Sequence, residues 1–251
     1  GVIRHGQANE KEEVKVAKAA TVEGKQIGVV INSETSLLAY RKDLFEQFKV
    51  KVPTTMKELE ETAKSFHGKE VDGKKMVGIT LRGKGAAATS QWVDFLYSFG
   101  GSWTNAQGQS NLAAPGSIAA FKFYGDLLKN YGPEGGTMLH WAESTSAFME
   151  GKAAMIYDAH VFKSLYENPK ESKVAGKVGY AVIPAGPAGS VPQVSNWSLS
   201  INKNSSADCP KAAWFFIQWA TSKENSLAAM LAGVPAGRAS AWNSADYKAK
   251  D

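Results

Sequence analysis

Polar and aromatic side chains gather at the ends of predicted strands between residues 151 and 197. The apolar run Lys152–Asp158 ends in a carboxylate, and His160 follows it closely. A later strand, predicted to begin at residue 195, opens with Asn196 and Trp197. In α/β proteins the ligand binds beyond the ends of the strands. These residues therefore predict a ligand site, and the remaining elements would hold or cover it.

Each of these side chains also has a purely structural alternative. An unpaired carboxylate at Asp158 would be costly to bury, so either a ligand or a helix N-terminus should satisfy it. Trp197 could be a stacking platform for a ligand or a core residue. Asn196 could bind a ligand or serve as a turn amide, and His160 could be a ligand residue, a helix cap or a surface residue.

Three further candidates precede this stretch in the chain. Arg82 follows a predicted strand in a glycine turn, where its guanidinium could fork two acceptors or form a surface salt bridge. The turn matches neither common phosphate-loop pattern. Glu143 lies just before a predicted helix and could bind a ligand or cap that helix, and Trp141 could be a second aromatic platform.

Composition excludes several functional classes. The chain has 251 residues, 43% of them hydrophobic and 21% charged, as in ordinary globular proteins. Its net charge of +5 comes from dispersed lysines, so we predict no nucleic-acid partner. One cysteine excludes an internal disulfide, and the four histidines lack metal-ligand spacing. We therefore predict no cofactor, no metal site and no membrane span.

Strands alternate with helices, which indicates an α/β architecture with mixed or parallel sheets. A polar break at residues 32–35 separates two predicted strands, 25–31 and 36–40, as expected where a chain crosses between lobes. Glu34 in this break could serve a hinge or a ligand. Residues 184–190 suggest a second crossing. Helices are predicted over residues 10–20, 43–48, 56–66, 90–99, 115–131, 144–150, 161–166, 210–220 and 221–231, with Trp92, Trp214 and Trp219 in the core.

Four blocks of sequence resemble the family 1 extracellular solute-binding proteins of bacterial sugar ABC importers, particularly the polyol and monosaccharide branch. The blocks are residues 32–45 followed by Val52–Thr55, residues 147–156, residues 176–180 with the Pro/Gly loop, and residues 214–223. The resemblance covers residue 24 to the end. It implies a type II periplasmic-binding-protein fold, in which two α/β lobes hold a sugar in the cleft between them.

Against this family the chain is expected to hold one complete three-layer lobe and one incomplete lobe. We predict an N-terminal stub with a crossing strand (1–32), the complete lobe (33–193) and the return segment of the incomplete lobe (194–251). A truncated lobe would leave apolar surface uncovered, which suggests self-association. The resemblance also places Arg238 in a loop that reaches the cleft, and it sets Asp158 opposite Trp197.

The function that the resemblance implies is capture of a sugar or polyol for the membrane permease subunits of an ABC importer, in the periplasm or outside the cell. The first alternative is a truncated or engineered lobe fragment with little or no binding. A less favoured alternative is a carbohydrate-acting enzyme that uses Glu143 and Asp158 as paired acids. No nucleophile motif supports that alternative.

Overall fold

The computed structural model describes residues 20–206 and 209–249, so nearly all of the helix predicted over residues 10–20 lies outside the described residues. The chain divides into two compact units: unit 1 comprises Gly1–Glu34 and Val194–Asp251, and unit 2 comprises Thr35–Gln193. Unit 2 has nearly the extent of the lobe expected over residues 33–193. That the two units are the complete and incomplete lobes of a larger protein stays a prediction.

A mixed sheet forms the centre of unit 2. Its strands follow the order β6 (Val77–Thr80), β7 (Ala153–Ala159), β3 (Val29–Arg41) and β8 (Val178–Ala181). β6 and β7 are parallel, whereas β3 is antiparallel to both β7 and β8. The parallel pair brings the ends of β6 and β7 to the same edge of the sheet.

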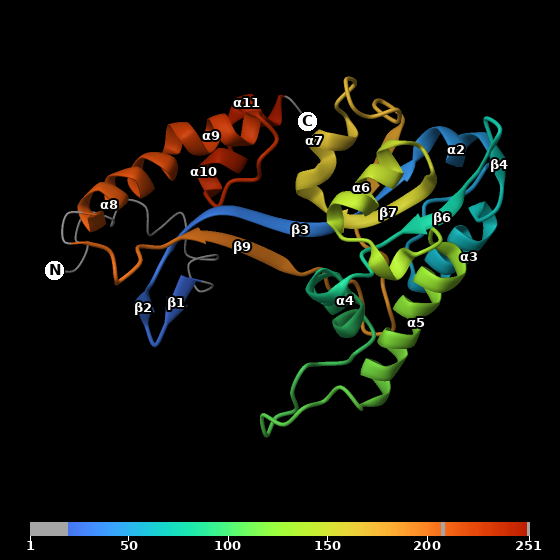
Figure 1. Ribbon diagram of the computed structural model, residues 1–251, viewed down its shortest axis with the longest axis horizontal. Coiled ribbons are helices and arrows are strands. Elements are labelled where there is room, and N and C mark those ends of the chain that lie inside the picture. The colour runs from blue at the N-terminus through green and yellow to red at the C-terminus, as the bar shows by residue number, and fades with distance from the viewer. Residues whose placement is uncertain (1–19, 207–208, 250–251) are drawn as a thin grey trace. The chain divides into compact units, whose positions relative to one another are not determined.

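Helices cover both faces of this sheet and make three layers (Figure 1). One face carries α2 (Lys42–Gln47), α3 (Met56–Phe66), α4 (Gly85–Ser98) and α5 (Pro115–Tyr131). The other carries α6 (Trp141–Met149), the 3-10 turn η3 (His160–Phe162) and α7 (Lys163–Tyr166). Neighbouring strand residues point to opposite faces, so Leu38 and Tyr157 join the first core and Ala39 and Ile156 the second. The predicted α/β fold with a three-layer unit is confirmed.

Local signals explain why the elements around the site begin where they do. The Thr55 side chain and the N3 carboxylate of Glu58 form a capping box at the start of α3. β6 then packs directly on α3, because a Cβ at Gly78 would lie 2.0 Å from the Ala63 carbonyl oxygen. Only glycine permits this close approach of β6 to α3. Two short hairpin strands, β4 (Glu70–Val71) and β5 (Lys74–Lys75), and the 3-10 turn η2 (Gly136–Met138) lie in the connections.

Unit 1 contains the hairpin β1 (Thr21–Val22) and β2 (Lys25–Gln26), the first part of β3, and β9 (Val194–Leu199), which pairs with β3. Four helices follow: α8 (Cys209–Ala220), α9 (Lys223–Leu231), α10 (Ala239–Trp242) and α11 (Ala245–Lys248). The small core of this unit consists of Met230, Ala236 and Ala241, with Trp242 and Tyr247 packed against it.

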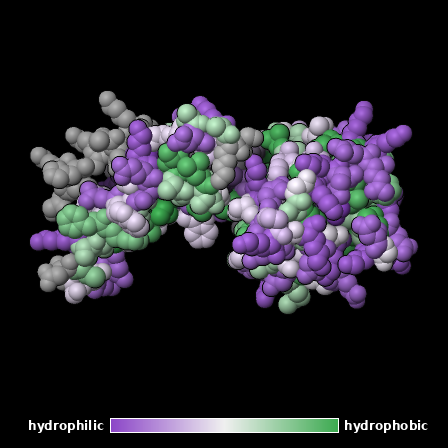
Figure 2. Space-filling model, turned by 90° about the horizontal axis from the view of Figure 1, so that it is seen from above, coloured by the Kyte–Doolittle hydropathy of each residue, from purple (hydrophilic) through white to green (hydrophobic). Residues whose placement is uncertain are grey.

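Large apolar side chains remain exposed on unit 1. Phe215, Phe216 and Trp219 of α8 are 70%, 55% and 62% exposed. Figure 2 shows hydrophobic surface over much of the described part of this unit. The prediction that Trp219 belongs to the core is therefore wrong, because α8 has no layer over that face within the described residues. Trp92 and Trp214 are half-buried.

Three predicted boundaries also need correction. The polar residues 32–35 do not interrupt a strand, since β3 is continuous and Ser33 N–H donates to the Pro235 carbonyl at 3.0 Å. α4 begins at Gly85 and not at Ser90. α6 begins at Trp141 because His140 and its neighbours supply the cap. Within the described residues no helix is long and apolar enough to cross a membrane.

Candidate functional site

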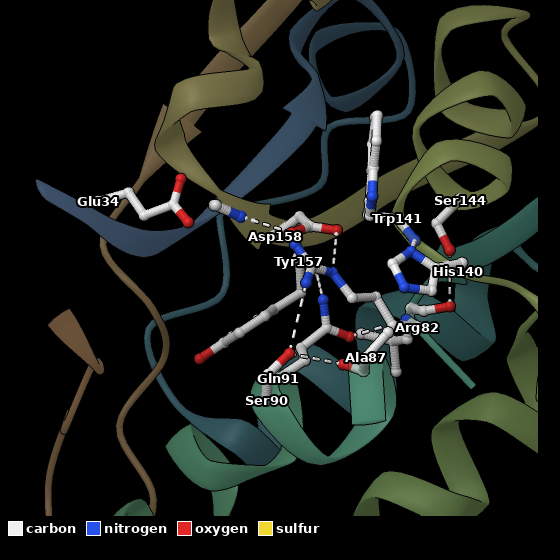
Figure 3. A network of polar contacts seen from close by, with 12 residues as sticks. Glu34, Arg82, Ala87, Ser90, Gln91, His140, Trp141, Ser144, Tyr157 and Asp158 are labelled. Atoms are coloured by element: carbon white, nitrogen blue, oxygen red, sulfur yellow. Dashed lines mark hydrogen bonds and ion pairs between the residues drawn. The ribbon is translucent and has the colours of Figure 1, made fainter. Parts of the chain in front are cut away.

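An ion pair between Arg82 and Asp158 joins the ends of β6 and β7. Arg82 Nε donates to Asp158 Oδ2 at 3.1 Å, and Arg82 Nη2 contacts Asp158 Oδ1 (Figure 3). The Asp158 side chain is 1% exposed and that of Arg82 is 16% exposed. A bidentate guanidinium–carboxylate pair fixes the planes of both groups. The sequence analysis considered a ligand or a helix N-terminus as the partner of Asp158. In the fold its partner is the side chain of Arg82.

Side chains from three helices hold the backbone that carries Arg82. The Arg82 N–H donates to Gln91 Oε1 on α4 at 2.9 Å, and the Tyr124 hydroxyl on α5 lies 2.8 Å from the same oxygen. The Ser144 hydroxyl on α6 donates to the Leu81 carbonyl at 2.9 Å. Burial raises the pKa of Tyr124 well above its usual range, so its hydroxyl remains a donor. The turn that presents Arg82 is therefore rigid.

Two aromatic rings stack beside this ion pair. Trp141 at the start of α6 lies on Phe162 with ring centroids 5.3 Å apart and planes 10° from parallel. The Arg82 guanidinium carbon lies 5.9 Å from the centroid of the Phe162 ring. Trp141 remains 40% exposed. The unit 2 wall is defined as Arg82, Asp158, Trp141 and Phe162. It combines a guanidinium, which a buried carboxylate orients, with an open indole.

Two other candidates in unit 2 make structural contacts. The His140 N–H donates to Glu143 Oε2 at 2.9 Å, so Glu143 forms the cap of α6. The N–H groups of Glu143 itself and of His140 hold the pKa of this carboxyl below its usual range. His160 Nδ1 accepts the Thr35 N–H at 3.0 Å, where β3 enters unit 2.

In unit 1, Glu34 and Trp197 form a pair on neighbouring strands. Trp197 Nε1 on β9 donates to Glu34 Oε1 on β3 at 3.0 Å. Trp197 is 62% exposed, which contradicts the core alternative for this residue. Asn196 Oδ1 is shielded from solvent and finds no hydrogen-bond partner among the described residues. The pair presents an indole that a carboxylate orients.

Arg238 is buried and bound to the backbone. Its Nε and Nη2 donate to the Thr221 carbonyl at 3.1 and 2.7 Å, just beyond the C-terminus of α8. A guanidinium there satisfies a carbonyl that the helix leaves unpaired and interacts favourably with the helix dipole. These contacts favour a structural role, and the ligand role that the family resemblance assigns to Arg238 stays a prediction.

Five of the nine predicted residues fall into two groups, Arg82, Asp158 and Trp141 in unit 2 and Glu34 and Trp197 in unit 1. Sequence reasoning missed the supporting residues Gln91, Tyr124, Ser144 and Phe162. For Tyr124 the available signal was a polar group on a mostly apolar helix face, whereas Gln91 and Ser144 share their buried faces with other polar residues. Among residues 20–206 and 209–249, no three His, Cys, Asp or Glu side chains are grouped so that they could hold a metal ion.

Comparison with known proteins places the chain in a family. A profile described as "bacterial extracellular solute-binding protein" matches residues 7–226. The chain belongs to the bacterial extracellular solute-binding protein family, as the sequence blocks predicted.

Relatives and solved structures agree with this assignment. The mannitol-binding protein of Pseudomonas aeruginosa is 31% identical over 92% of this chain and 54% of its own length. A solute-binding protein of Agrobacterium radiobacter in complex with ribitol superposes with a TM-score of 0.85 at 28% identity, over 98% of this chain and 63% of that one. One of Agrobacterium vitis with bound D-mannitol gives 0.81 at 35% identity, over 94% and 58%. The chain thus spans roughly half to two thirds of the length of these proteins.

Proposed function

We propose that this protein is, or is part of, the substrate-binding component of an ABC importer, and that it captures a sugar or a polyol. The unit 2 wall is the observation that carries the proposal. An open indole covers the C–H face of a sugar or polyol, and the Arg82 guanidinium, held in place by the buried Asp158 carboxylate, offers donors to hydroxyl groups. Relatives described as binding mannitol, ribitol, erythritol or L-threitol support this substrate class.

The contacts of the two carboxylates count against the enzyme alternative. A glycosidase acid must be protonated at the start of the reaction. The pKa of Glu143 is lowered by the backbone N–H groups at the start of α6, so it stays ionised near neutral pH. Asp158 is held in a bidentate pair with Arg82. Neither group has the environment of a general acid.

Calorimetry with ribitol, D-mannitol, erythritol and maltose, alongside a hydrolysis assay on chromogenic glycosides, separates the three hypotheses. We expect heat of binding with at least one polyol and no turnover. Turnover would refute the binding-protein proposal. If neither binding heat nor turnover is detected, the result would favour the hypothesis of a lobe fragment with little or no binding, because the chain spans only about half the length of its curated relatives.

Two tryptophans of similar exposure give a matched test of the unit 2 wall. Trp141 is 40% exposed and Trp103 is 37% exposed, but Trp103 contacts Trp92 edge-on and lies outside the wall. We expect Trp141→Ala to weaken polyol binding at least tenfold, about 1.4 kcal/mol, and Trp103→Ala to leave it unchanged. Equal losses in both variants would reject the wall as the ligand site.

Unit 1 is tested in the same way. If the oriented indole contacts ligand, Trp197→Ala abolishes binding, and Trp197→Phe, which removes the donor to Glu34 and leaves a smaller ring, weakens it less. Unchanged affinity in Trp197→Ala would reject the platform. We further propose that the protein works in the periplasm or outside the cell, with ABC permease subunits as its partners.

The exposed aromatic face of α8 supports a last element of the proposal, self-association of this chain. Three large side chains lie exposed on one helix, a pattern that commonly marks an interaction surface. Sedimentation velocity should show a concentration-dependent dimer, and Phe216→Ser combined with Trp219→Ser should convert it to a monomer. A monomer at all concentrations would remove self-association from the proposal.

A further inference from the structure

The chain enters and leaves unit 2 at two positions that are hydrogen-bonded to each other. β3 enters the unit at Thr35, and the chain leaves it at Gln193. The Thr35 hydroxyl donates to the Gln193 carbonyl at 2.8 Å. Gln193 Nε2 also donates to the Ser90 carbonyl of α4 at 2.5 Å. We call residues 35–36, where the chain enters, and Gln193, where it leaves, the exits of unit 2.

A buried carboxylate on α4, Asp94, is bonded to both exits. Asp94 Oδ1 accepts the Gln193 N–H at 2.8 Å, and Oδ2 accepts the Tyr157 hydroxyl at 3.1 Å. The hydroxyl of Ser36, next to the entry at Thr35, is a further hydrogen-bond partner. Asp94 is completely buried. One side chain thus connects the incoming strand, the outgoing segment and the central strand β7.

No cation compensates the charge of Asp94 among the described residues. The charged group that acts on it is Asp158 on β7, and Asp158 is itself paired with Arg82 in the loop after β6. The other titratable groups that face it are Tyr124 on α5 and Tyr157 on β7, whose hydroxyls stay protonated because burial raises their pKa values. A buried carboxylate without a cation is costly, even when it is hydrogen-bonded.

We propose that Asp94 is a proton-controlled positioning residue for the two exits of unit 2. The ionised carboxylate favours opening of the Gln193 contact, since opening admits water to the charge. The neutral acid favours the closed, hydrogen-bonded exits. The idea that the exits act as a hinge for ligand capture rests on the proposed function. The pH dependence of their opening does not rest on it.

The direction of the pH effect follows from linkage. Burial raises the pKa of Asp94 from 3.8 to about 6, and the charge of Asp158 adds to this, against the hydrogen bonds from Ser36, Gln193 and Tyr157. In an opened state that hydrates the carboxyl, the pKa returns toward 3.8. The closed state therefore binds the proton more tightly, and acid closes the exits. The pKa difference of about 2 limits the total effect to about a hundredfold in the opening equilibrium.

Hydrogen exchange of the Gln193 amide, measured without ligand between pH 7.5 and pH 5, tests the proposal directly. After correction for the intrinsic exchange rate, we expect the protection of this amide to rise about tenfold as the pH falls over this range, with the rise beginning near pH 6. Asp94→Asn should show a protection that does not depend on pH and is at least that of the wild type at pH 7.5. Asp126→Asn on α5 is the matched control and should behave as the wild type, because Asp126 pairs with exposed Lys122.

Wild-type protection that stays flat or falls with acid would overturn the proposal, as would pH dependence that persists in Asp94→Asn. If Asp94→Asn does not fold, Tyr157→Phe replaces it. Loss of the hydroxyl donor should move the pH at which protection begins to rise to a higher value, and an onset that is unchanged or lower would equally overturn the proposal. Failure of the protein to bind polyols would refute the proposed function and leave the exchange result intact.

Discussion

The ion pair between Arg82 and Asp158 should contribute a large coupling energy, because one partner is wholly buried and the contact is bidentate. At an effective dielectric constant of about 20, unit charges about 4 Å apart attract by about 4 kcal/mol. Removing one partner of a buried pair costs about 3–5 kcal/mol, since the other charge is left uncompensated. Arg82 retains some contact with solvent, so we expect a coupling of about 2–3 kcal/mol.

A double-mutant cycle measures this coupling. The variants Arg82→Met, Asp158→Asn and the double variant are compared with the wild type by urea unfolding followed by circular dichroism. Asn at position 158 retains the oxygen that accepts the Ala159 N–H at 2.7 Å, and its amide nitrogen replaces the oxygen that accepts from Arg82 Nε, so the substitution removes the charge and one acceptor. The control cycle uses Lys122 and Asp126, an exposed pair on α5, for which no measurable coupling is expected.

A coupling below about 1 kcal/mol for Arg82 and Asp158 would refute the reasoning, as would a value equal to that of the exposed pair. In that case the buried carboxylate would owe its stability to the backbone N–H of Ala159 and not to the guanidinium. The unit 2 wall would then lack a fixed charged pair, and the polyol proposal would lose its main geometric support.

Three further predictions concern the elements that position the wall. Thr55→Ala should lower the free energy of unfolding by about 1 kcal/mol in urea denaturation, because α3 loses its N-cap. Glu58→Gln should destabilise the protein at pH 7 but not at pH 2. The backbone N–H and hydroxyl of Thr54 lower the pKa of Glu58, so its contribution to stability is present above the ordinary pKa of 4.5 and is lost as the pH falls through the lowered pKa. Gly78→Ala should cost about 3 kcal/mol or more, because its Cβ would meet the Ala63 carbonyl, and a thermal midpoint within two degrees of wild type would contradict this.

Local signals in the sequence predicted several elements well. Pro115 and the glycine after Tyr131 mark the ends of α5, and Thr55 marks the start of α3. These predictions succeeded because caps and helix breakers act within one turn of the chain. The break predicted at residues 32–35 failed because strand pairing is not local. Backbone contacts to Pro235 and Ala236 keep those polar residues extended.

For the candidate site residues, too, the sequence limited the alternatives and the contacts in the fold decided between them. Glu143 was identified as either a ligand or a cap, and only the position of His140 decided that it caps α6. Trp197 was identified as either a platform or a core residue, and its exposure decided against the core. Asp94 gave no signal at all, because its significance comes from residues that are far from it in the sequence.

The sequence by itself determined the α/β class, the family, and the presence of Arg82 and Asp158 at the ends of two strands. These features could be predicted because strand ends and the blocks typical of the family are patterns of consecutive residues. The tertiary structure alone decided that these two side chains form a pair, since that depends on the parallel register of β6 and β7. It likewise brought Phe162 against Trp141 and bonded Asp94 to both exits of unit 2. Contacts of this kind join distant segments, and no periodicity within either segment encodes its partner.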